Sequence, residues 1–355
     1  MANRLNRLRS AMTERGIDAV LVSCEVNQSW ISGFDFTDGY ILVCPERAYL
    51  ITDPRYIEAA KKETDGAFEC VCGTANVSEM LSSYLSDNSA RVLGIEDKEL
   101  SHYGAESLKC ALSGVKTVGL GDTFDDLRAQ KDDDEIASII EAQRLTDLAF
   151  FHILGYIKEG VTEIDIAIEL EFFMRKMGAS ARSFDFIVAS GTASSMPHAQ
   201  PRNVPLQKGF LTLDFGCVCG GYCSDMTRTI VVGKADERLK HIYDTVLRAQ
   251  QAAISFITEG VLCSDADKAA RDIIEREYAG LFSHSLGHGV GRRIHESPRL
   301  SPKAVGTRLA CGNVVTVEPG IYIEGECGCR IEDMLVIRDG CAIDITNSPK
   351  ELIEI

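Results

Sequence analysis

The segment Leu211–Thr227, LTLDFGCVCGGYCSDMT, places two aspartates on either side of a Gly-Gly pair. Residues alternate in polarity around the glycines, which predicts two antiparallel strands joined by a tight turn. A fold centred midway between residues 219 and 220 pairs Asp214 with Asp225. Cross-strand partners lie about 5 Å apart, and two ionised carboxylates at that distance repel unless a proton or cation lies between them. The hairpin therefore predicts a cation site, whereas a slipped register would leave both aspartates as ordinary surface residues.

A second hairpin repeats this arrangement in VVTVEPGIYIEGECGCRIEDMLVI, residues 314–337. Glu318 and Glu332 are symmetric about Gly325, and a Pro-Gly pair directly after Glu318 indicates a strand that ends at a site. Two independent hairpins that each bring an acidic pair together are improbable by chance. The alternative is that Glu318 faces solvent and that RIED is an exposed salt-bridge cluster.

Histidines supply further candidate ligands. Four of the seven lie in or near loops rich in glycine or proline: His198, His284, His288 and His295. Four carboxylates with one imidazole form an oxygen-rich donor set, suited to two divalent ions and less to a thiolate zinc site. Such an ion pair, roughly 3.5–4 Å apart, supports hydrolysis of amides or esters. The pattern therefore predicts a two-metal hydrolase.

Composition excludes several other classes of function. The chain has 355 residues and a formal net charge of −16, which argues against nucleic acid as a partner. The N-terminus, MANRLNRLRSAMTERG, has helical spacing without the apolar core of a signal peptide, and no apolar run approaches about 18 residues. We therefore expect a cytoplasmic protein without a membrane partner. Thirteen cysteines, an odd number, indicate reduced thiols in packing roles.

The order of predicted elements indicates two domains. Residues 1–122 alternate helical and strand patterns, which is typical of an α/β domain. The acidic segment KDDDEIASIIEAQRL then opens a long helix, with acids in the first turn, where the helix dipole favours them. In residues 123–355, helix pairs followed by strands occur twice, which predicts an α+β domain of two similar halves.

Together, these motifs resemble the pita-bread metallopeptidases, specifically the Xaa-Pro peptidase branch of prolidases and aminopeptidases P. The resemblance spans nearly the whole chain and is carried by TLDFG…GYCSDMTRT, GHGVGRRIHESPR, TVEPGIY, RIEDMLVI, SFDFIVASGTASSMPH and the N-terminal WISGFDFTDGYILV…ITDPRYIEAA. It implies a creatinase-like α/β domain over residues 1–122 and a pita-bread catalytic domain over residues 123–355.

The resemblance also assigns roles to individual residues. It implies two divalent metal ions, commonly manganese or cobalt, with zinc or iron as alternatives, held by Asp214, Asp225, His288, Glu318 and Glu332. Catalytic roles fall to His198, His284, His295 and Arg330, and substrate binding falls to Phe184, Ile294, Arg299 and Tyr322. In this scheme a metal-bound hydroxide attacks the scissile carbonyl, His295 stabilises the intermediate and Glu318 shuttles a proton.

The resemblance favours an Xaa-Pro dipeptidase and leaves an Xaa-Pro aminopeptidase as the alternative. A creatinase-like hydrolase lacks the metal ligands, and methionine aminopeptidases usually lack this N-terminal domain. A catalytically inactive interaction module is the remaining alternative, although such relatives typically lose ligands. The resemblance also implies a homodimer, in which residues 30–38 would approach the partner's cleft.

Overall fold

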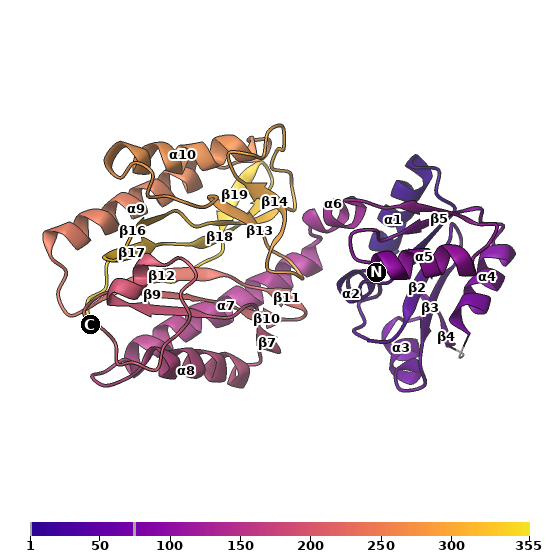
Figure 1. Cartoon of the computed structure of the whole chain (residues 1–355), viewed down its shortest axis with the longest axis horizontal. Coiled ribbons are helices and arrows are strands. Elements are labelled where there is room, and N and C mark those ends of the chain that lie inside the picture. The colour runs from indigo at the N-terminus through magenta and orange to yellow at the C-terminus, as the bar shows by residue number, and fades with distance from the viewer. Residues whose placement is uncertain (1, 74–75) are drawn as a thin grey trace. The chain divides into compact units, whose positions relative to one another are not determined.

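The computed structural model describes residues 2–73 and 76–355 (Figure 1). The chain divides into two compact units, Met1–Arg128 and Ala129–Ile355. Helix α6 (Thr123–Ala129) therefore falls almost wholly in the first unit, whereas the sequence placed residues 123–129 in the second domain. Within the described ranges, no helix combines the length and the apolar character needed to cross a membrane.

The N-terminal unit is a six-stranded sheet with helices packed against it. Its strand order is β4 (Glu69–Cys72), β3 (Ala48–Thr52), β2 (Tyr40–Val43), β1 (Ala19–Val22), β5 (Val92–Ile95), β6 (Lys116–Gly119). Besides α6, its helices are α1 (Ala2–Glu14), α2 (Glu25–Ser32), α3 (Ile57–Glu63), α4 (Val77–Asp87) and α5 (His102–Ala111). The predicted α/β class of this unit is confirmed.

Strand β1 explains why the unit needs helices on both faces of the sheet. Val20 and Val22 contribute to one apolar core, and Ala19 and Leu21 contribute to the other. A strand that is apolar on both faces is stable only when both faces are covered. Trp30 belongs to the first core and is fully buried, whereas Gly33, Asp35, Thr37 and Asp38 of the same segment are exposed, so the approach of residues 30–38 to a partner stays a prediction.

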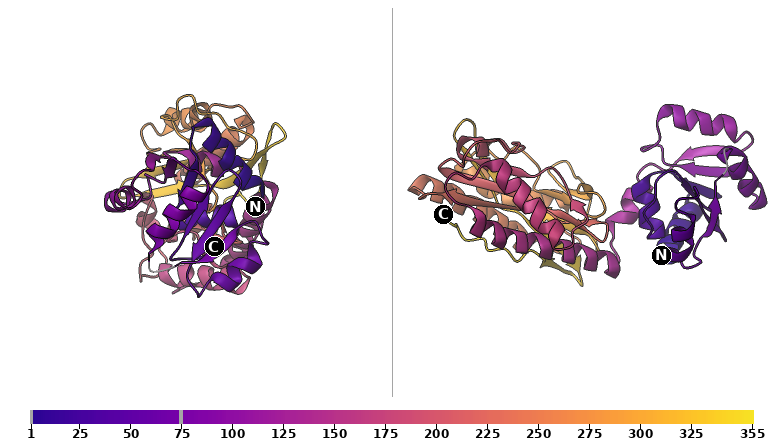
Figure 2. Two further views of the ribbon diagram at one scale, coloured as in Figure 1. Left: turned by 90° about the vertical axis from the view of Figure 1, so that its right-hand side faces the viewer. Right: turned by 90° about the horizontal axis from the view of Figure 1, so that it is seen from below.

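The C-terminal unit contains the two expected helix pairs. The first pair is α7 (Asp133–Tyr156) and α8 (Glu163–Lys176), and the second is α9 (Glu237–Phe256) and α10 (Cys263–Glu277). Capping boxes at Asp132 and Thr162 start α7 and α8 by satisfying backbone N–H groups of the first turn. Figures 1 and 2 show one pair on each side of the strands, so the strands are enclosed between the helices.

The strands of this unit form several small sheets. The largest has the order β14 (Glu296–Leu300), β13 (Gly287–Gly289), β15 (Val314–Val317), β18 (Asp333–Arg338), β19 (Cys341–Asp344). A second has the order β12 (Met226–Val232), β9 (Gly209–Phe215), β8 (Ile187–Ser190), followed along the chain by the 3-10 helix η1 (Gly191–Ser195). Shorter ladders join β16 (Gly320–Ile323) to β17 (Cys327–Arg330), and β10 (Cys217–Cys219) to β11 (Tyr222–Cys223) and β7 (Ala181–Arg182).

The first hairpin forms, but its turn centre lies one residue later than predicted, so its register is wrong by two residues. Asp214 pairs with Thr227, not with Asp225. Gly220 and Gly221 have φ of 57° and 79° and form a two-residue turn, which centres the hairpin between them. This is the left-handed turn that matches the twist of paired strands. Asp225 consequently lies just before β12, two residues before the partner of Asp214.

The second hairpin has the predicted register. Gly320 pairs with Arg330, and Val317 pairs with Asp333, so both ladders are centred on Gly325. Glu318 and Glu332 lie between these two ladders, at the same point on opposite strands. All thirteen cysteines lie in the described part of the chain and are free thiols. Nine are buried or partly buried, in line with the expected packing role, but Cys72, Cys110, Cys311 and Cys341 are exposed, so that expectation is wrong for these four.

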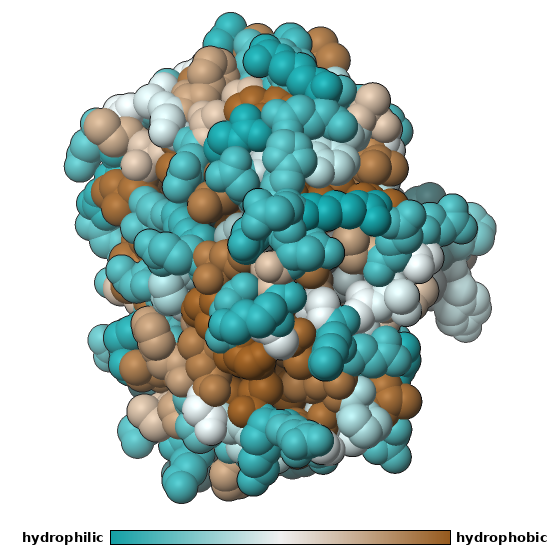
Figure 3. Space-filling model, turned by 90° about the vertical axis from the view of Figure 1, so that its left-hand side faces the viewer, coloured by the Kyte–Doolittle hydropathy of each residue, from teal (hydrophilic) through white to brown (hydrophobic). Residues whose placement is uncertain are grey.

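Side chains on the outside of the molecule are not uniformly polar. Figure 3 shows apolar side chains gathered in the lower part of one face, crossed by hydrophilic ones. Exposed apolar side chains of the C-terminal unit include Phe151 on α7, and Ile168 and Phe172 on α8, which are 53%, 62% and 60% exposed. Exposed apolar side chains that gather in patches often mark interaction surfaces.

Candidate active site

A cavity of about 460 Å³ in the C-terminal unit collects the site residues that the sequence indicated. It is lined by Asp214, Asp225, His288, Glu318, Glu332, His198, His284, His295, Arg330, Phe184, Ile294 and Arg299. Tyr322 is the exception, since it is not among the lining residues and lies behind Arg330. The lining also includes Asp185, Ile187, Pro197 and Gln200, which the sequence did not single out.

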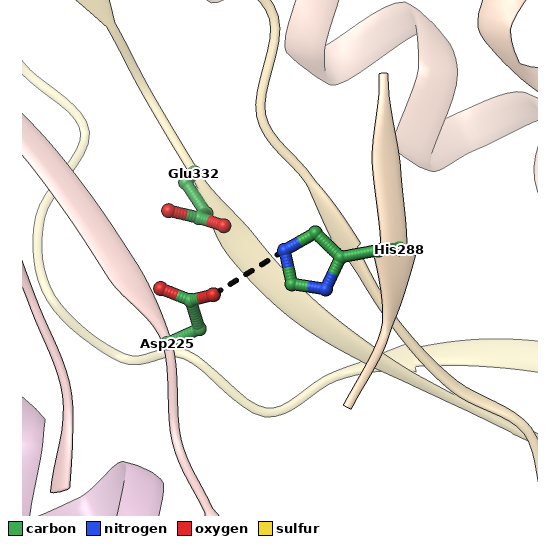
Figure 4. A group of neighbouring side chains, drawn as sticks. All are labelled: Asp225, His288 and Glu332. Atoms are coloured by element: carbon green, nitrogen blue, oxygen red, sulfur yellow. Dashed lines mark ion pairs between the residues drawn. The ribbon is translucent and has the colours of Figure 1, made fainter. Parts of the chain in front are cut away.

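The most compact group in the cavity is formed by Asp225, His288 and Glu332. One ligand atom from each residue lies within 4.8 Å of the others, and all three residues are buried. They come from three separate places: Asp225 precedes β12, His288 lies on β13, and Glu332 precedes β18. Figure 4 shows the three side chains pointing toward one another. This arrangement is suitable for binding a metal ion.

Histidine 288 presents a lone pair to carboxylates. Its Nδ1 lies 3.1 Å from the carbonyl oxygen of Gly289, which can only accept, so Nδ1 carries the proton. Nε2 lies 3.5 Å from Asp225 Oδ2 and 3.4 Å from Glu318 Oε1. Burial, with a contribution from His295, lowers the pKa of His288 to about 3, so the ring is neutral. A lone pair facing carboxylate oxygens is the donor geometry that a divalent cation requires.

The protein itself offsets the charge of the surrounding carboxylates only in part, through Arg330. Burial raises the pKa of Asp225 well above its ordinary value, and the neighbouring Asp214 and Glu318 add to the effect. Burial likewise raises the pKa of Glu318 to about 8, and that of Glu332 well above its usual range. Asp214 Oδ1 is buried without a hydrogen-bond partner in the described residues. Buried, mutually repelling carboxylates are suited to binding divalent cations. The charge of the cations would offset the desolvation of the carboxylates and the repulsion between them.

Arg330 connects the two hairpins beside this cluster. The guanidinium is buried, and Nη2 donates to Asp214 Oδ2 at 2.6 Å, while Nε donates to Thr227 Oγ1 at 3.0 Å. The Thr227 hydroxyl lies 2.7 Å from Glu332 Oε2. Arg330 and Thr227 together therefore hold one carboxylate from each hairpin in place.

Thr227 was not identified from the sequence, because the predicted register placed Asp225 opposite Asp214. The sequence nevertheless contained the information needed to identify Thr227. A Gly-Gly pair in a two-residue turn puts the centre of the hairpin between the glycines, and this register makes Thr227 the partner of Asp214.

Tyr322 positions His284 and does not line the cavity. Its hydroxyl accepts a hydrogen bond from Arg330 Nη1 at 2.6 Å, so its own proton is available to His284 Nε2 at 3.0 Å. The Nδ1 of His284 lies 2.9 Å from the carbonyl oxygen of Ser285 and carries the proton. Burial, with Arg330 adding to it, lowers the pKa of His284 to about 3. The ring is therefore neutral and in a defined tautomer.

The remaining predicted residues form the more open part of the cavity. Phe184 and Ile294 are partly buried, while His198, His295 and Arg299 are exposed. The rings of His295 and His288 are 4.3 Å apart. Burial and the nearby Arg299 lower the pKa of His295. Apolar and cationic groups therefore face the same space as the carboxylate cluster.

The fold and the cavity together define a class of protein. Two similar halves enclose buried carboxylates and a neutral imidazole that fit divalent ions, as in a pita-bread metal-dependent hydrolase. The chain belongs to Metallopeptidase family M24, which matches residues 137–339. Residues 4–130 match the Creatinase/Prolidase N-terminal domain. The predicted Xaa-Pro peptidase branch of the family is confirmed by relatives along the whole chain.

Three relatives illustrate this similarity. The chain is 36% identical to an Xaa-Pro dipeptidase from Pyrococcus horikoshii, over 99% of both chains. The structure of an Xaa-Pro dipeptidase from Bacillus anthracis superposes with a TM-score of 0.96 at 41% identity, covering 100% of this chain and 99% of the other. An X-Pro aminopeptidase from Thermotoga maritima gives a TM-score of 0.91 at 34% identity, covering 96% and 98%.

Proposed function

We propose that this protein is a metal-dependent peptidase that hydrolyses the Xaa-Pro bond of dipeptides. The observation that carries the proposal is the cavity, which joins the carboxylate and imidazole cluster to a wall containing Phe184 and Ile294. Membership of the metallopeptidase family supports the metal-dependent hydrolase activity. The relatives named Xaa-Pro dipeptidase support the substrate class.

The ligand set that we propose is Asp214, Asp225, His288, Glu318 and Glu332, holding two divalent ions, with manganese or cobalt favoured. The oxygen-rich donors support this choice of metals. When bound, such ions activate water near neutral pH and polarise the substrate carbonyl. The unpartnered Asp214 Oδ1 and the neutral His288 Nε2 are the donor atoms that fit this role.

The residues around the ligands supply the other steps. We assign to His295 the hydrogen bond that stabilises the developing oxyanion, since the ring lies beside His288. The Glu318 carboxylate takes the proton released by water and returns it to the leaving nitrogen. Arg330 keeps Asp214 oriented through its 2.6 Å hydrogen bond. His198 and His284 line the cleft where the substrate backbone would bind.

Substrate recognition follows from the chemistry of proline. A proline after the scissile bond leaves an amide without N–H, and its ring is best accommodated by apolar side chains such as Phe184 and Ile294. A dipeptidase must also bind the free carboxylate that follows proline. Arg299 lines the cavity and is our candidate, because a guanidinium can bind a carboxylate through two hydrogen bonds.

An Xaa-Pro aminopeptidase is the second candidate function. The similarity to the Thermotoga maritima X-Pro aminopeptidase favours it, and that structure matches this fold almost as closely as the dipeptidase does. The two candidates differ in whether the cavity accepts residues after proline.

Hydrolysis of a small peptide panel distinguishes the two activities. The metal-reconstituted protein is assayed with Met-Pro, Ala-Pro, Ala-Pro-Ala and, as a control without proline, Ala-Ala. Cleavage of Met-Pro and Ala-Pro in preference to Ala-Pro-Ala is the expected result. Efficient cleavage of Ala-Pro-Ala with little activity on Ala-Pro would instead assign the protein as an aminopeptidase.

We also propose a homodimer, supported by the exposed apolar side chains on α7 and α8. Sedimentation at micromolar concentration should give twice the 38.8 kDa mass of one chain. A species of only 38.8 kDa would rule the dimer out.

A further inference from the structure

We propose that Asp267 and Arg271 on α10 are positioning residues that hold the loop carrying His284 and thereby place its ring in the active site. Neither residue lines the cavity. The inference rests on the proposed peptidase function and extends it to a helix outside the cavity.

The two side chains form a paired unit on one face of α10. Arg271 Nε donates to Asp267 Oδ2 at 2.7 Å, and Nη2 donates to Oδ1 at 2.9 Å. The Asp267 side chain is 1% exposed, and that of Arg271 is 22% exposed. A bidentate pair of this kind has a defined geometry, because both hydrogen bonds constrain the planar guanidinium. The pair is therefore a rigid point from which a loop can be held.

The same pair binds the loop before β13 at three backbone atoms. Arg271 Nη1 donates to the carbonyl oxygen of Phe282 at 2.8 Å, and Nη2 donates to that of His284 at 2.7 Å. Asp267 Oδ1 accepts from the backbone N–H of Leu286 at 2.9 Å. These three contacts fix the backbone on both sides of the His284 side chain.

Ring contacts transmit the same constraint to the imidazole. The Arg271 guanidinium lies over the Phe282 ring, 4.2 Å from its centroid. The Phe282 and His284 rings meet edge to face, with centroids 5.0 Å apart. Tyr322 holds the opposite end of the imidazole through Nε2. His284 is thus held between Phe282 and Tyr322, and Arg271 supports the Phe282 side.

The other half of the unit has a comparable arrangement. Glu163, at the start of α8, accepts hydrogen bonds from the backbone N–H groups of Ser190 and Arg202 at 2.8 and 2.9 Å. The Arg202 side chain donates to the same carboxylate. His198 lies in the segment between those two anchors. In both halves, a buried carboxylate on the second helix and an arginine therefore hold a segment that carries a cleft histidine.

A double-mutant cycle tests whether Arg271 acts through His284. For Arg271→Ala in the metal-loaded enzyme, we expect kcat for Ala-Pro to fall about tenfold or more, with KM within about twofold and metal content unchanged. In a His284→Ala background the same substitution should change kcat less than about twofold. An equal loss in both backgrounds, or no loss in the wild-type background, overturns the proposal.

Two further variants distinguish loss of the loop contact from a general disturbance of the fold. Arg248→Ala removes an arginine that joins α9 to Glu277 on α10 without touching the loop, and should leave kcat unchanged. A tenfold loss in that variant would attribute the effect to the helix pair in general. If Arg271→Ala does not fold, Arg271→Lys decides the question, because lysine keeps the charge but cannot make the bidentate pair.

Hydrogen exchange supplies a readout that does not depend on peptidase activity. In the metal-free protein, Arg271→Ala should raise the exchange rate of residues 282–288 about tenfold, while Arg248→Ala leaves it unchanged. Unchanged exchange in Arg271→Ala overturns the proposed loop contact. Wild-type protein that cleaves none of the Xaa-Pro peptides would instead refute the proposed function, and the exchange experiment would still test the loop contact.

Discussion

Replacing Glu163 with glutamine should weaken the C-terminal unit and loosen the segment that carries His198. The Glu163 side chain is fully buried and accepts hydrogen bonds from the backbone and side chain of both Ser190 and Arg202. Burial opposes its ionisation, but the hydrogen bonds from Arg202 and Ser190 outweigh burial, and the pKa of Glu163 lies below its ordinary value. The carboxylate is therefore charged at neutral pH, and glutamine would turn an amide N–H₂ toward donors.

The expected loss of stability follows from the burial of Glu163 and the partial exposure of Arg202. Breaking a buried ion pair costs about 3–5 kcal/mol, but Arg202 is 37% exposed and regains water, so we expect about 2–3 kcal/mol. A unit of this size loses about 2–4 °C per kcal/mol, which predicts a decrease in Tm of roughly 4–12 °C. Calorimetry of the unfolding of the C-terminal unit measures this decrease in Tm. Glu171→Gln is the matched control, because the ion pairs of Glu171 with Arg175 on α8 and Arg182 on β7 are largely exposed and should contribute less than about 1 kcal/mol.

The pH dependence of Tm tests whether the negative charge of Glu163 causes the stabilisation. Because the folded-state pKa of Glu163 is lowered, its stabilisation is present above the unfolded value of about 4.3 and is lost as pH falls through the folded value. The difference in Tm between wild type and Glu163→Gln should therefore narrow below about pH 4. A difference that stays constant from pH 7 to pH 3.5, or a Tm within 2 °C of wild type at pH 7, would refute the argument.

Three further predictions concern the metal site and the substrate. Chelator-treated protein should lose activity and regain it with manganese or cobalt at about two ions per chain by elemental analysis, and full activity without metal would contradict the assignment. His288→Ala should lose metal and activity, whereas His295→Ala should keep its metal and lose turnover by roughly a hundredfold; equal metal contents in the two variants would argue against these roles. Arg299→Ala should raise KM for Ala-Pro more than it lowers kcat in steady-state assays, and an unchanged KM would remove the carboxylate contact.

The two hairpins show what local sequence determines. Gly325 predicted the register that places Glu318 opposite Glu332, because a tight turn constrains the residues on either side of it. The same reasoning failed at Asp214 only because the turn centre was taken one residue too early. Turn chemistry acts over a few residues, so the sequence contains the information needed for both registers.

The family motifs extended this prediction to the cleft residues. Histidines and acids separated along the chain were assigned to one site because their motifs occur together, and the cavity does bring them together. The exception is Tyr322, which faces Arg330 and His284. A motif identifies a residue without stating which of its neighbours it contacts.

Tertiary structure alone decided how the site residues are held. The pair Asp267 and Arg271 meets the His284 loop only because α10 packs against β14, and Glu163 meets Arg202 because α8 packs against β8. No periodicity or turn residue encodes such contacts, since the partners are 11 to 39 residues apart. Local sequence therefore determined the elements and the chemistry available, whereas the packing of helices on strands determined which buried charges meet.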